Sequence, residues 1–377
     1  MIYNALKSIR RLLPVAIGLI LLGTSSVKAE NVPSDTPPRL RGFMSNGRLE
    51  GNDFAEMHRW GANLVRLQII TRHEAARIGK SVWDAWPLML DRLEEQVKAA
   101  DAAGLKVAVV LMGFPSNQRV NQNSNFWDDP STPEILSKVW TDIARRLLPW
   151  RHAIYGYDIF NEPLDRAQLP DTPKQWHAIA TRITEAIRQI DTDTWVICET
   201  GPGFFFTGFE RFTPLSDKRV IYSAHFYEPD WFTHQGILTD KIGNHYPSVQ
   251  DEQRTWSRSS GEKNVQWNKE RLAKEMQPAL DFQKKYNVPI YVGEFSVIRW
   301  APEEDAPKWL QDVIDLIEER GWSWSYHAFR EFNGWSLEHD ETFWDRKTPP
   351  SVPRPQPVDY ETERAKVIKK ALQKNDA

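Results

Sequence analysis

The chain has 377 residues, a formal net charge of −3 and one cysteine. A single cysteine excludes an intramolecular disulfide, so a hydrophobic core must stabilise the fold, and an apolar content of 41% is enough to build one. The slight excess of negative charge argues against a polyanionic partner such as nucleic acid. Cys198 ends the apolar run Trp195-Val-Ile-Cys, which is typical of a buried core residue rather than a nucleophile.

Residues 1–29 have the layout of a secretory signal peptide, with a basic start, a short apolar stretch and small residues at a cleavage site. These parts are Lys7, Arg10 and Arg11, then Leu12–Gly23, then Val27-Lys28-Ala29. The apolar stretch is shorter than the roughly 20 residues of a membrane-spanning helix. We expect cleavage after Ala29, which removes four basic and no acidic residues and changes the net charge from −3 to −7. The mature protein is then secreted or periplasmic, with no membrane attachment.

After this segment, short apolar runs alternate with longer amphipathic ones. Several short runs are apolar without interruption, as in Val107-Ala-Val-Val-Leu-Met, which is typical of strands buried on both faces of a parallel sheet. The pattern predicts strands at Leu40–Met44, Leu64–Ile69, Lys106–Met112, Ala153–Phe160, Thr194–Glu199, Val220–His225, Pro289–Glu294 and Trp322–Phe329.

Between the strands, apolar residues recur at helical spacing, as at Trp309, Val313 and Ile317. The same pattern predicts helices around 90–104 and 135–147, and over Thr172–Ile190, Asn268–Tyr286 and Thr362–Leu372. The connection between Glu199 and Val220 is expected to be short or irregular. Eight strands that alternate with helices, without a linker, predict an α/β fold: one (β/α)₈ TIM barrel domain over residues 30–377. A doubly wound open sheet is the alternative, disfavoured because no glycine-rich phosphate loop follows an early strand.

Two of the predicted strands run into a carboxylate. The fourth leads to Asn161-Glu162-Pro163 and the seventh to Gly293-Glu294-Phe295. In a barrel, reactive side chains come from the carboxyl ends of the strands, and strands four and seven lie across the barrel mouth from each other. Hydrolysis of an acetal needs such a pair: an acid that protonates the leaving oxygen, and a carboxylate that attacks or stabilises the sugar. The two lie about 5 Å apart in retaining enzymes.

These two motifs, together with three others in the same order, resemble glycoside hydrolase family 5, which contains retaining cellulases and mannanases with an Asn-Glu-Pro signature. The other matching segments are Arg41-Gly42, Trp60-Gly61-Ala62-Asn63-Leu64-Val65-Arg66 and His225-Phe226-Tyr227. The resemblance covers nearly the whole chain after the signal peptide. It implies a barrel that needs no cofactor, with Glu162 as the acid/base and Glu294 as the nucleophile.

The resemblance also implies substrate-binding residues, and each has a physical role to play. Arg66, which is always charged, can keep the nucleophile ionised and oriented. Asn161 can donate a hydrogen bond to the sugar 2-hydroxyl, which strengthens in the transition state. Tyr227 can hydrogen-bond the nucleophile, and His225 can orient the acid/base or bind sugar.

The chain departs from the family pattern in two places. Met112 stands where the family's third strand carries a histidine, which removes a polar contact with the sugar. The eighth strand normally supplies a tryptophan floor, but the sequence around Trp322-Ser-Trp324-Ser-Tyr326-His327 leaves the register open. Trp324, His327 or Trp335 can take that place.

Tryptophan is abundant, with 17 residues in the chain. Those in segments expected to be loops are Trp83, Trp86, Trp127, Trp231, Trp300, Trp335 and Trp344. Aromatic faces stack on sugar rings, so loop tryptophans above a barrel suit a polysaccharide cleft. The segment Phe226–Trp267 is expected to form a variable wall of that cleft.

We expect an endo-β-1,4-glucanase (cellulase) that works as a monomer on β-glucan or a related polysaccharide. A β-mannanase and an exo-enzyme active on β-1,3-glucan are alternatives, because specificity lies in loops rather than in fold or motif. A non-catalytic saccharide-binding protein on the same barrel is an alternative of another class. The loss of the family histidine at Met112 supports this alternative, and the intact pair Glu162 and Glu294 argues against it. No metal is expected, since the histidines lack ligand spacing; His225, Glu228 and His234 are close enough in sequence to meet at one loop.

Overall fold

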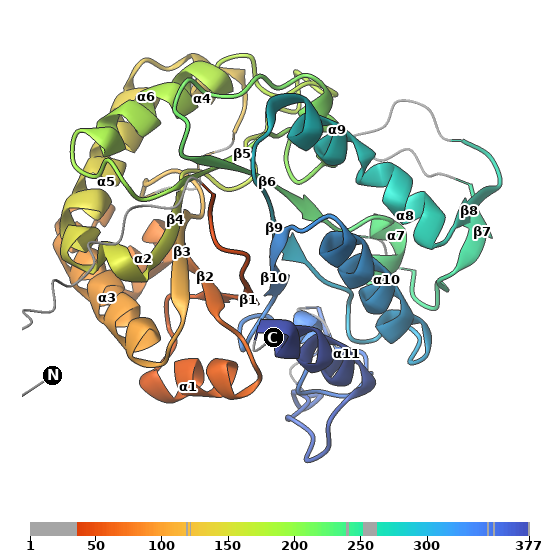
Figure 1. Cartoon of the computed structure of the whole chain (residues 1–377). Coiled ribbons are helices and arrows are strands. Elements are labelled where there is room, and N and C mark those ends of the chain that lie inside the picture. Colours follow the sequence, from red (N-terminus) through yellow and green to blue (C-terminus); the bar gives the residue numbers. More distant parts are fainter. Residues whose placement is uncertain are drawn as a thin grey trace, which may run out of the picture. The chain divides into compact units, whose positions relative to one another are not determined.

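Eight parallel strands close into a barrel (Figure 1). The structure, a computed structural model, describes residues 36–117, 120, 122–238, 241–251, 262–344, 347–349 and 351–375. In their order around the barrel, the strands are β1 (Arg41–Asn46), β10 (Ser323–His327), β9 (Ile290–Phe295), β6 (Val220–Phe226), β5 (Val196–Glu199), β4 (Ile154–Asp158), β3 (Lys106–Leu111) and β2 (Leu64–Ile69). The predicted signal peptide, residues 1–29, lies outside the described residues.

All eight predicted strands are present, each with its ends within two residues of the prediction, and the open-sheet alternative is wrong. The strands are buried on both faces, as β2 and β9 are along their whole length, which explains their continuous apolar sequences. The barrel closes where β1 pairs with β10, with Arg41 opposite Trp324. On its other side β1 packs so tightly on β2 that a Cβ atom at Gly42 would lie 1.7 Å from the carbonyl oxygen of Leu64. Only glycine fits there.

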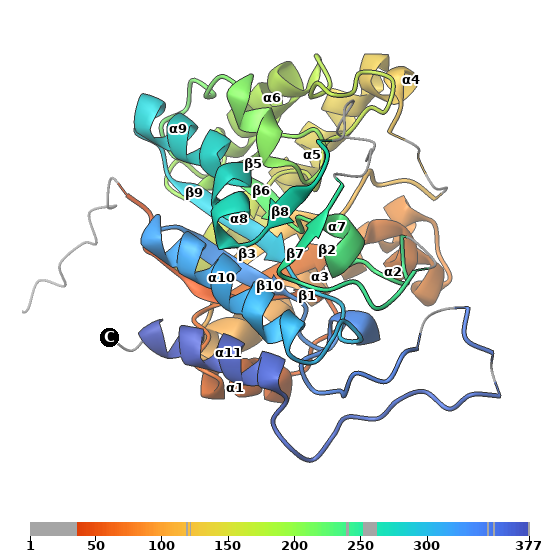
Figure 2. The same cartoon turned by 90° about the vertical axis from the view of Figure 1, so that its right-hand side faces the viewer.

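Helices surround the barrel, as Figures 1 and 2 show. They are α1 (Gly51–Arg59), α2 (Thr71–Ile78), α3 (Val82–Ala102), α4 (Ser124–Asp128), α5 (Ser131–Leu147), α6 (Trp176–Arg188), α7 (Asp230–Thr233), α8 (Lys269–Glu275), α9 (Gln277–Tyr286), α10 (Asp305–Glu319) and α11 (Glu363–Leu372), with short 3₁₀ helices η1 (Leu148–Ala153), η2 (Phe206–Glu210), η3 (Asn333–Trp335) and η4 (Gln373–Asn375). The predicted helix over 268–286 is two helices that meet at Met276. The connection from β5 to β6 contains the short η2, which confirms the expected irregularity.

Most of the tryptophans expected in loops lie elsewhere. Trp86, Trp127 and Trp231 belong to helices and are 4%, 2% and 4% exposed, so they pack in the core. Trp83 is also helical, but it is 40% exposed on the outer surface of α3. The expectation that these four tryptophans lie in loops is therefore wrong. The prediction for Cys198 is confirmed, because this residue is a free and buried cysteine.

The connection between β6 and β9 is the longest excursion from the barrel. It contains α7 and a two-stranded antiparallel sheet of β7 (Ser248–Gln250) and β8 (Val265–Trp267), which lies on the side that faces the viewer in Figure 2. Residues 239–240 and 252–261 of this connection lie outside the described residues. Across the part of the chain that the structure describes, no helix combines the length and the apolar character needed to cross a membrane.

Candidate active site

The carboxyl ends of the barrel strands carry a cluster of polar side chains. Because all eight strands run parallel, these ends share one rim. The cluster contains Arg66 from β2, Asn161 and Glu162 after β4, Glu199 from β5, His225 and Tyr227 at the end of β6, Glu294 from β9 and His327 from β10. All of these except Glu199 are residues that the sequence had predicted for the site.

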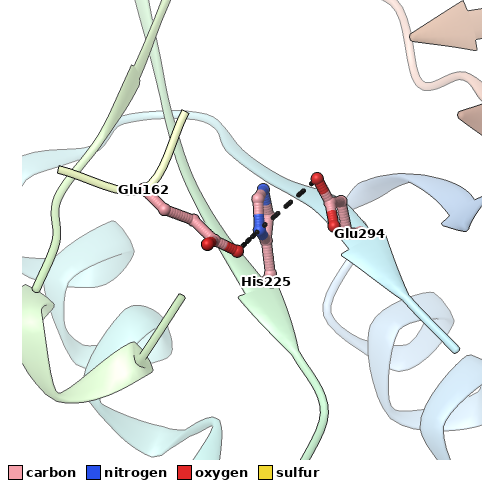
Figure 3. Close-up of side chains that lie close together, drawn as sticks. All are labelled: Glu162, His225 and Glu294. Carbon is pink, nitrogen blue, oxygen red and sulfur yellow. Dashed lines mark hydrogen bonds and ion pairs between the residues drawn. The ribbon is translucent and has the colours of Figure 1, made fainter. Parts of the chain in front are cut away.

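Glu162 and Glu294 face each other with His225 between them (Figure 3). The Nδ1 atom of His225 lies 2.8 Å from Oε1 of Glu162 and 3.7 Å from Oε1 of Glu294. One carboxylate oxygen of Glu162 lies within 4.8 Å of one of Glu294. This separation is close to the roughly 5 Å of retaining glycosidases and shorter than the roughly 6.5–9.5 Å of inverting ones. The side chain of Glu162 is 32% exposed and that of Glu294 is 5% exposed, so Glu162 lies nearer the opening.

Glu294 is held by three donors. Its Oε1 atom accepts a hydrogen bond of 2.6 Å from Nη1 of Arg66, and its Oε2 atom accepts one of 2.7 Å from the hydroxyl of Tyr227. Nδ1 of His327 lies 3.0 Å from the same Oε2 atom. Arg66 on one oxygen, and Tyr227 and His327 on the other, fix the orientation of this carboxylate and favour its ionised form.

The surroundings move the pKa values of the two carboxyl groups in opposite directions. Burial raises the pKa of Glu162, and the hydrogen bond from His225 offsets this only in part. Burial also acts to raise the pKa of Glu294, but the positive charges of His225, His327 and Arg66 outweigh burial and hold this pKa well below its ordinary value. Two carboxyl groups with pKa values pushed apart suit one proton donor and one carboxylate at neutral pH.

Arg66 lies fully buried beneath this pair and connects several acidic groups. Its Nε atom donates to Asp158 at 2.8 Å, and its Nη2 atom donates to Oε1 of Glu199 at 2.8 Å and to Oδ1 of Asn161 at 3.1 Å. Burial acts to lower the pKa of Arg66, but the surrounding carboxylates outweigh burial and raise it. Because the oxygen of Asn161 accepts from Arg66, its amide nitrogen is the end that can donate to a ligand.

Sequence reasoning missed Glu199, which ends β5 and is fully buried. Its Oε2 atom accepts a hydrogen bond of 2.8 Å from the backbone N–H of Glu162, and its Oε1 atom lies 3.2 Å from Nε2 of His225. A signal was present in the sequence, since Glu199 closes a predicted strand as Glu294 does. A single carboxylate at a strand end is too common to be assigned a role without its contacts.

His327 and Trp335 both lie at the site, as predicted. His327 contacts the hydroxyl of Tyr227 at 2.8 Å through Nδ1 and Glu331 at 3.1 Å through Nε2. Burial acts to lower the pKa of His327, but the charges of Glu294 and Glu331 outweigh it and raise this pKa to about 10. The ring of Trp335 lies 6.0 Å from those of Tyr227 and His327, centroid to centroid, which makes it an aromatic side wall.

Trp324 is not part of the site, and this candidate requires correction. Its indole Nε1 atom donates to Glu318 at 2.9 Å, and its ring packs on Phe295 with centroids 5.5 Å apart. Glu318 also binds Arg41 at the start of β1, so this contact lies near the opposite end of the barrel. Successive residues of a strand point to opposite faces, so Trp324, three residues before His327, faces away from it.

Met112 follows β3 directly, and its backbone N–H donates to Ile69 at 3.0 Å. The residue is partly exposed at the same rim as the other site residues. It is therefore adjacent to Asn161, whose backbone N–H donates to Leu111 at 3.1 Å. The position agrees with the motif alignment, and methionine supplies no strong hydrogen-bonding group there.

Among the described residues, one group of three offers atoms close enough to share a metal ion: Glu162, His225 and Glu294, within 4.8 Å of one another. A hydrogen bond between His225 and Glu162 and an ion pair between His225 and Glu294 account for this cluster. The combination of His225, Glu228 and His234 does not form such a group within the described part of the chain. Instead, the ring of His234 packs on Tyr227 with centroids 4.8 Å apart, and burial lowers its pKa to about 3.

A closed (β/α)₈ barrel with two facing carboxylates on the carboxyl-end rim has the arrangement of a glycoside hydrolase. A family model described as "Cellulase (glycosyl hydrolase family 5)" matches residues 33–333, and the chain belongs to this family.

Three comparisons place the chain among known proteins. It is 28% identical over 221 residues to endoglucanase C of Acetivibrio thermocellus, a match covering 54% of this chain and 63% of that protein. It is 25% identical over 286 residues to cellodextrinase A of Ruminococcus flavefaciens, covering 72% of this chain and 76% of that protein. The first of these matches thus spans less than two thirds of the relative's length. The Thermotoga maritima Cel5A structure with cellobiose aligns with a TM-score of 0.63 at 22% identity, covering 88% of this chain and 97% of that one. That likeness concerns the fold.

Proposed function

We propose that the protein is a secreted glycoside hydrolase that cleaves β-linked polysaccharide with retention of configuration, and that its main activity is that of an endo-β-1,4-glucanase. The observation that carries the proposal is the pair Glu162 and Glu294, with carboxylate oxygens within 4.8 Å and pKa values displaced in opposite directions. That separation leaves no room for a water between carboxylate and sugar, so one carboxylate attacks directly.

The proposed reaction has two steps. Glu294 attacks the anomeric carbon while the proton of Glu162 passes to the glycosidic oxygen, so that the aglycone leaves and a glycosyl ester forms on Glu294. The ionised Glu162 then takes a proton from water, which attacks the same carbon and releases the sugar from Glu294. Arg66 and Tyr227 orient the nucleophile through their bonds to its two oxygens.

Relatives support a β-1,4-glucan as the substrate, because endoglucanase C is named for a glucan and cellodextrinase A for the fragments of cellulose. Two other glycans have support of their own. Thermotoga maritima Cel5A has a crystal structure in complex with mannotriose, and the chain is 27% identical over 188 residues to the probable glucan 1,3-β-glucosidase A of Aspergillus fumigatus. Mannan and β-1,3-glucan are therefore the alternatives to test.

Secretion is proposed from the layout of residues 1–29. The protein recovered from outside the cytoplasm should have the mass of a chain that begins at Glu30. In size-exclusion chromatography its elution volume should match that of a single chain.

The deciding experiment is reducing-sugar release from carboxymethyl cellulose, mannan, xylan and β-1,3-glucan, with the anomer of the first product followed by NMR. We expect the largest kcat/KM on the cellulose derivative, a rapid fall in its viscosity, and a β-anomer formed first. An α-anomer contradicts retention, and faster hydrolysis of mannan or β-1,3-glucan moves the assignment to that glycan. Binding without hydrolysis of any glycan establishes the non-catalytic alternative.

A further inference from the structure

Glu199 contacts three members of the site, although no sequence motif marks it. Its Oε2 atom accepts the backbone N–H of Glu162 at 2.8 Å. Its Oε1 atom accepts from Arg66 at 2.8 Å and lies 3.2 Å from Nε2 of His225. Its own side chain is 0% exposed, so it lies behind these groups and does not reach a bound sugar.

The hydrogen bond from the N–H of Glu162 to Glu199 stabilises Glu162 in an unfavourable backbone conformation. Glu162 has a φ angle of +51°, in the left-handed region that residues with a side chain rarely adopt. Such conformations persist where surrounding contacts hold them, and they are common at functional sites. The bond from the Glu162 N–H to Glu199 is such a contact, and it acts on the peptide that aims the carboxyl group.

The other contacts define the state of His225. One ring nitrogen faces Glu162 and the other faces Glu199, at 2.8 Å and 3.2 Å. A neutral imidazole can donate from only one nitrogen, whereas an imidazolium donates from both. A carboxylate 3.2 Å from Nε2 stabilises the positive charge of the imidazolium without a well-aligned hydrogen bond, and the Nδ1 atom of this ring donates to Oε1 of Glu162. The remaining oxygen of Glu162 is then the one that carries the transferable proton.

We propose that Glu199 is a positioning residue: its carboxylate holds the backbone of Glu162, the imidazolium of His225 and the guanidinium of Arg66 in one arrangement, and so aims the acid/base at the glycosidic oxygen. The inference rests on the proposed glycosidase function. It assigns to the end of β5 a role separate from those of the two reacting carboxylates.

The chain supplies a matched control in Asp158. This carboxylate is also 0% exposed and also accepts from Arg66 at 2.8 Å, but through Nε. Within the described part of the chain, the backbone N–H of Glu162 donates to Glu199 and not to Asp158, and the two carboxyl groups differ in that respect. Asp158→Asn and Glu199→Gln therefore each replace with an amide a fully buried carboxyl group that contacts Arg66, and only the second disturbs the acid/base directly.

Glutamine at 199 cannot satisfy all three neighbours, whichever way its amide is turned. With its oxygen toward Arg66 and His225, its NH₂ group opposes the N–H of Glu162. With its NH₂ group toward Arg66 and His225, it opposes two donors. We expect Glu199→Gln to lower kcat/KM by about 100-fold on an aryl cellobioside with a poor leaving group, which needs protonation, and by less than about 5-fold on one with a good leaving group. Asp158→Asn should lower kcat/KM on the two substrates by similar factors, each smaller than the roughly 100-fold loss expected for Glu199→Gln on the poor leaving group.

A second readout does not depend on turnover. In ¹⁵N-histidine-labelled protein, with the His225 signals assigned through their loss in a His225→Gln variant, the wild type should show both ring nitrogens protonated at pH 7. In Glu199→Gln the ring should lose its proton at lower pH than in the wild type and in Asp158→Asn, because an adjacent negative charge is gone. If the glutamine variant fails to fold, Glu199→Asp, which keeps the charge but shortens the reach, serves the kinetic comparison on the two aryl cellobiosides.

Equal losses of kcat/KM on the two aryl cellobiosides, or an unchanged titration of His225, would overturn the positioning role. An inactive wild type contradicts the proposed function instead, and the NMR titration still decides whether Glu199 holds His225.

Discussion

Glu162 and Glu294 present carboxylate oxygens within 4.8 Å of each other, yet one side chain is 32% exposed and the other 5%. The more exposed group has the raised pKa, and the deeper one has the lowered pKa. A proton donor must reach the glycosidic oxygen, and a nucleophile must be ionised and held still. The difference in environment therefore allocates the two roles, and the predictions below test that allocation.

Glu294→Gln should reduce turnover by at least about 1,000-fold while oligosaccharide binding remains, because the amide keeps the shape and removes the nucleophile. Calorimetric titration with cellotetraose measures the binding, and reducing-sugar release measures the turnover. Residual activity within tenfold of the wild type would contradict the role of Glu294.

The pH profile of kcat/KM should be a bell whose two limbs belong to different carboxyl groups. Glu162 must be protonated, so the rate falls as pH rises through its raised pKa. Glu294 must be ionised, so the rate falls as pH drops through its lowered pKa. Glu162→Gln should abolish the alkaline limb and lower kcat/KM about 100-fold or more on substrates with poor leaving groups. An alkaline limb that survives in this variant assigns it to another group.

His327→Gln should move the acidic limb to higher pH. His327 has a pKa of about 10 and is charged at neutral pH, 3.0 Å from Glu294. Removing one neighbouring positive charge raises the pKa of the nucleophile. Glu331→Gln is the matched variant, because it removes the other partner of His327 and leaves the imidazole in place. An acidic limb at the same pH in wild type and His327→Gln would show that this charge does not act on Glu294.

Met112→His should change kcat/KM on the best substrate several-fold, because it restores a polar group beside Asn161 at the rim. The measurement is steady-state kinetics over the glycan panel, paired with thermal unfolding. A lowered unfolding temperature with unchanged kinetics means that Met112 only packs at the rim and does not shape the sugar site.

Glu318→Gln should destabilise the fold without changing kcat/KM. Glu318 binds Arg41 at 2.8 Å and Trp324 at 2.9 Å, away from the catalytic rim. Burial acts to raise the pKa of Glu318, but these bonds outweigh it and lower the pKa. The resulting stability is present above the unfolded pKa, about 4.3, and is lost as pH falls through the folded pKa. We expect a loss of about 1–3 kcal/mol in the free energy of unfolding at pH 7, shrinking toward pH 3. Urea denaturation at both pH values measures it, and an equal loss at both contradicts an ionic contribution.

The barrel was predictable because its strands are buried on both faces, so the sequence itself reveals their number and order. The two carboxylates were predictable for a related reason, since each marks the point where an apolar strand ends. The end of a strand can be recognised from the local sequence alone. Because the strands of a barrel run parallel, residues at their carboxyl ends then lie on the same rim.

The eighth strand was harder, because a tryptophan three residues earlier than His327 is equally aromatic but faces the other way. The pairing of β10 with β9 also shifts register between Trp324 and Tyr326, which no local pattern reveals. Glu199 escaped prediction because its role lies in contacts with residues 37 and 133 positions away. Trp127 and Trp231 escaped because the short helices α4 and α7 resemble loops in sequence, and Trp83 and Trp86 escaped because they lie in the first turns of α3, before the part of this helix that the sequence predicted.

The seam between β1 and β10 has a consequence for the order of synthesis. Arg41 pairs with Trp324, and the N–H of Leu40 bonds the hydroxyl of Ser323, 283 residues further along the chain. While a ribosome is still making the segment that precedes β9, β1 has a partner on one side only, and its other edge is open to mispairing. Contacts this distant in sequence form late and slowly. Glu294, the proposed nucleophile, and His327 arrive on the last two strands, so the growing chain holds no complete site until the barrel is ready to close.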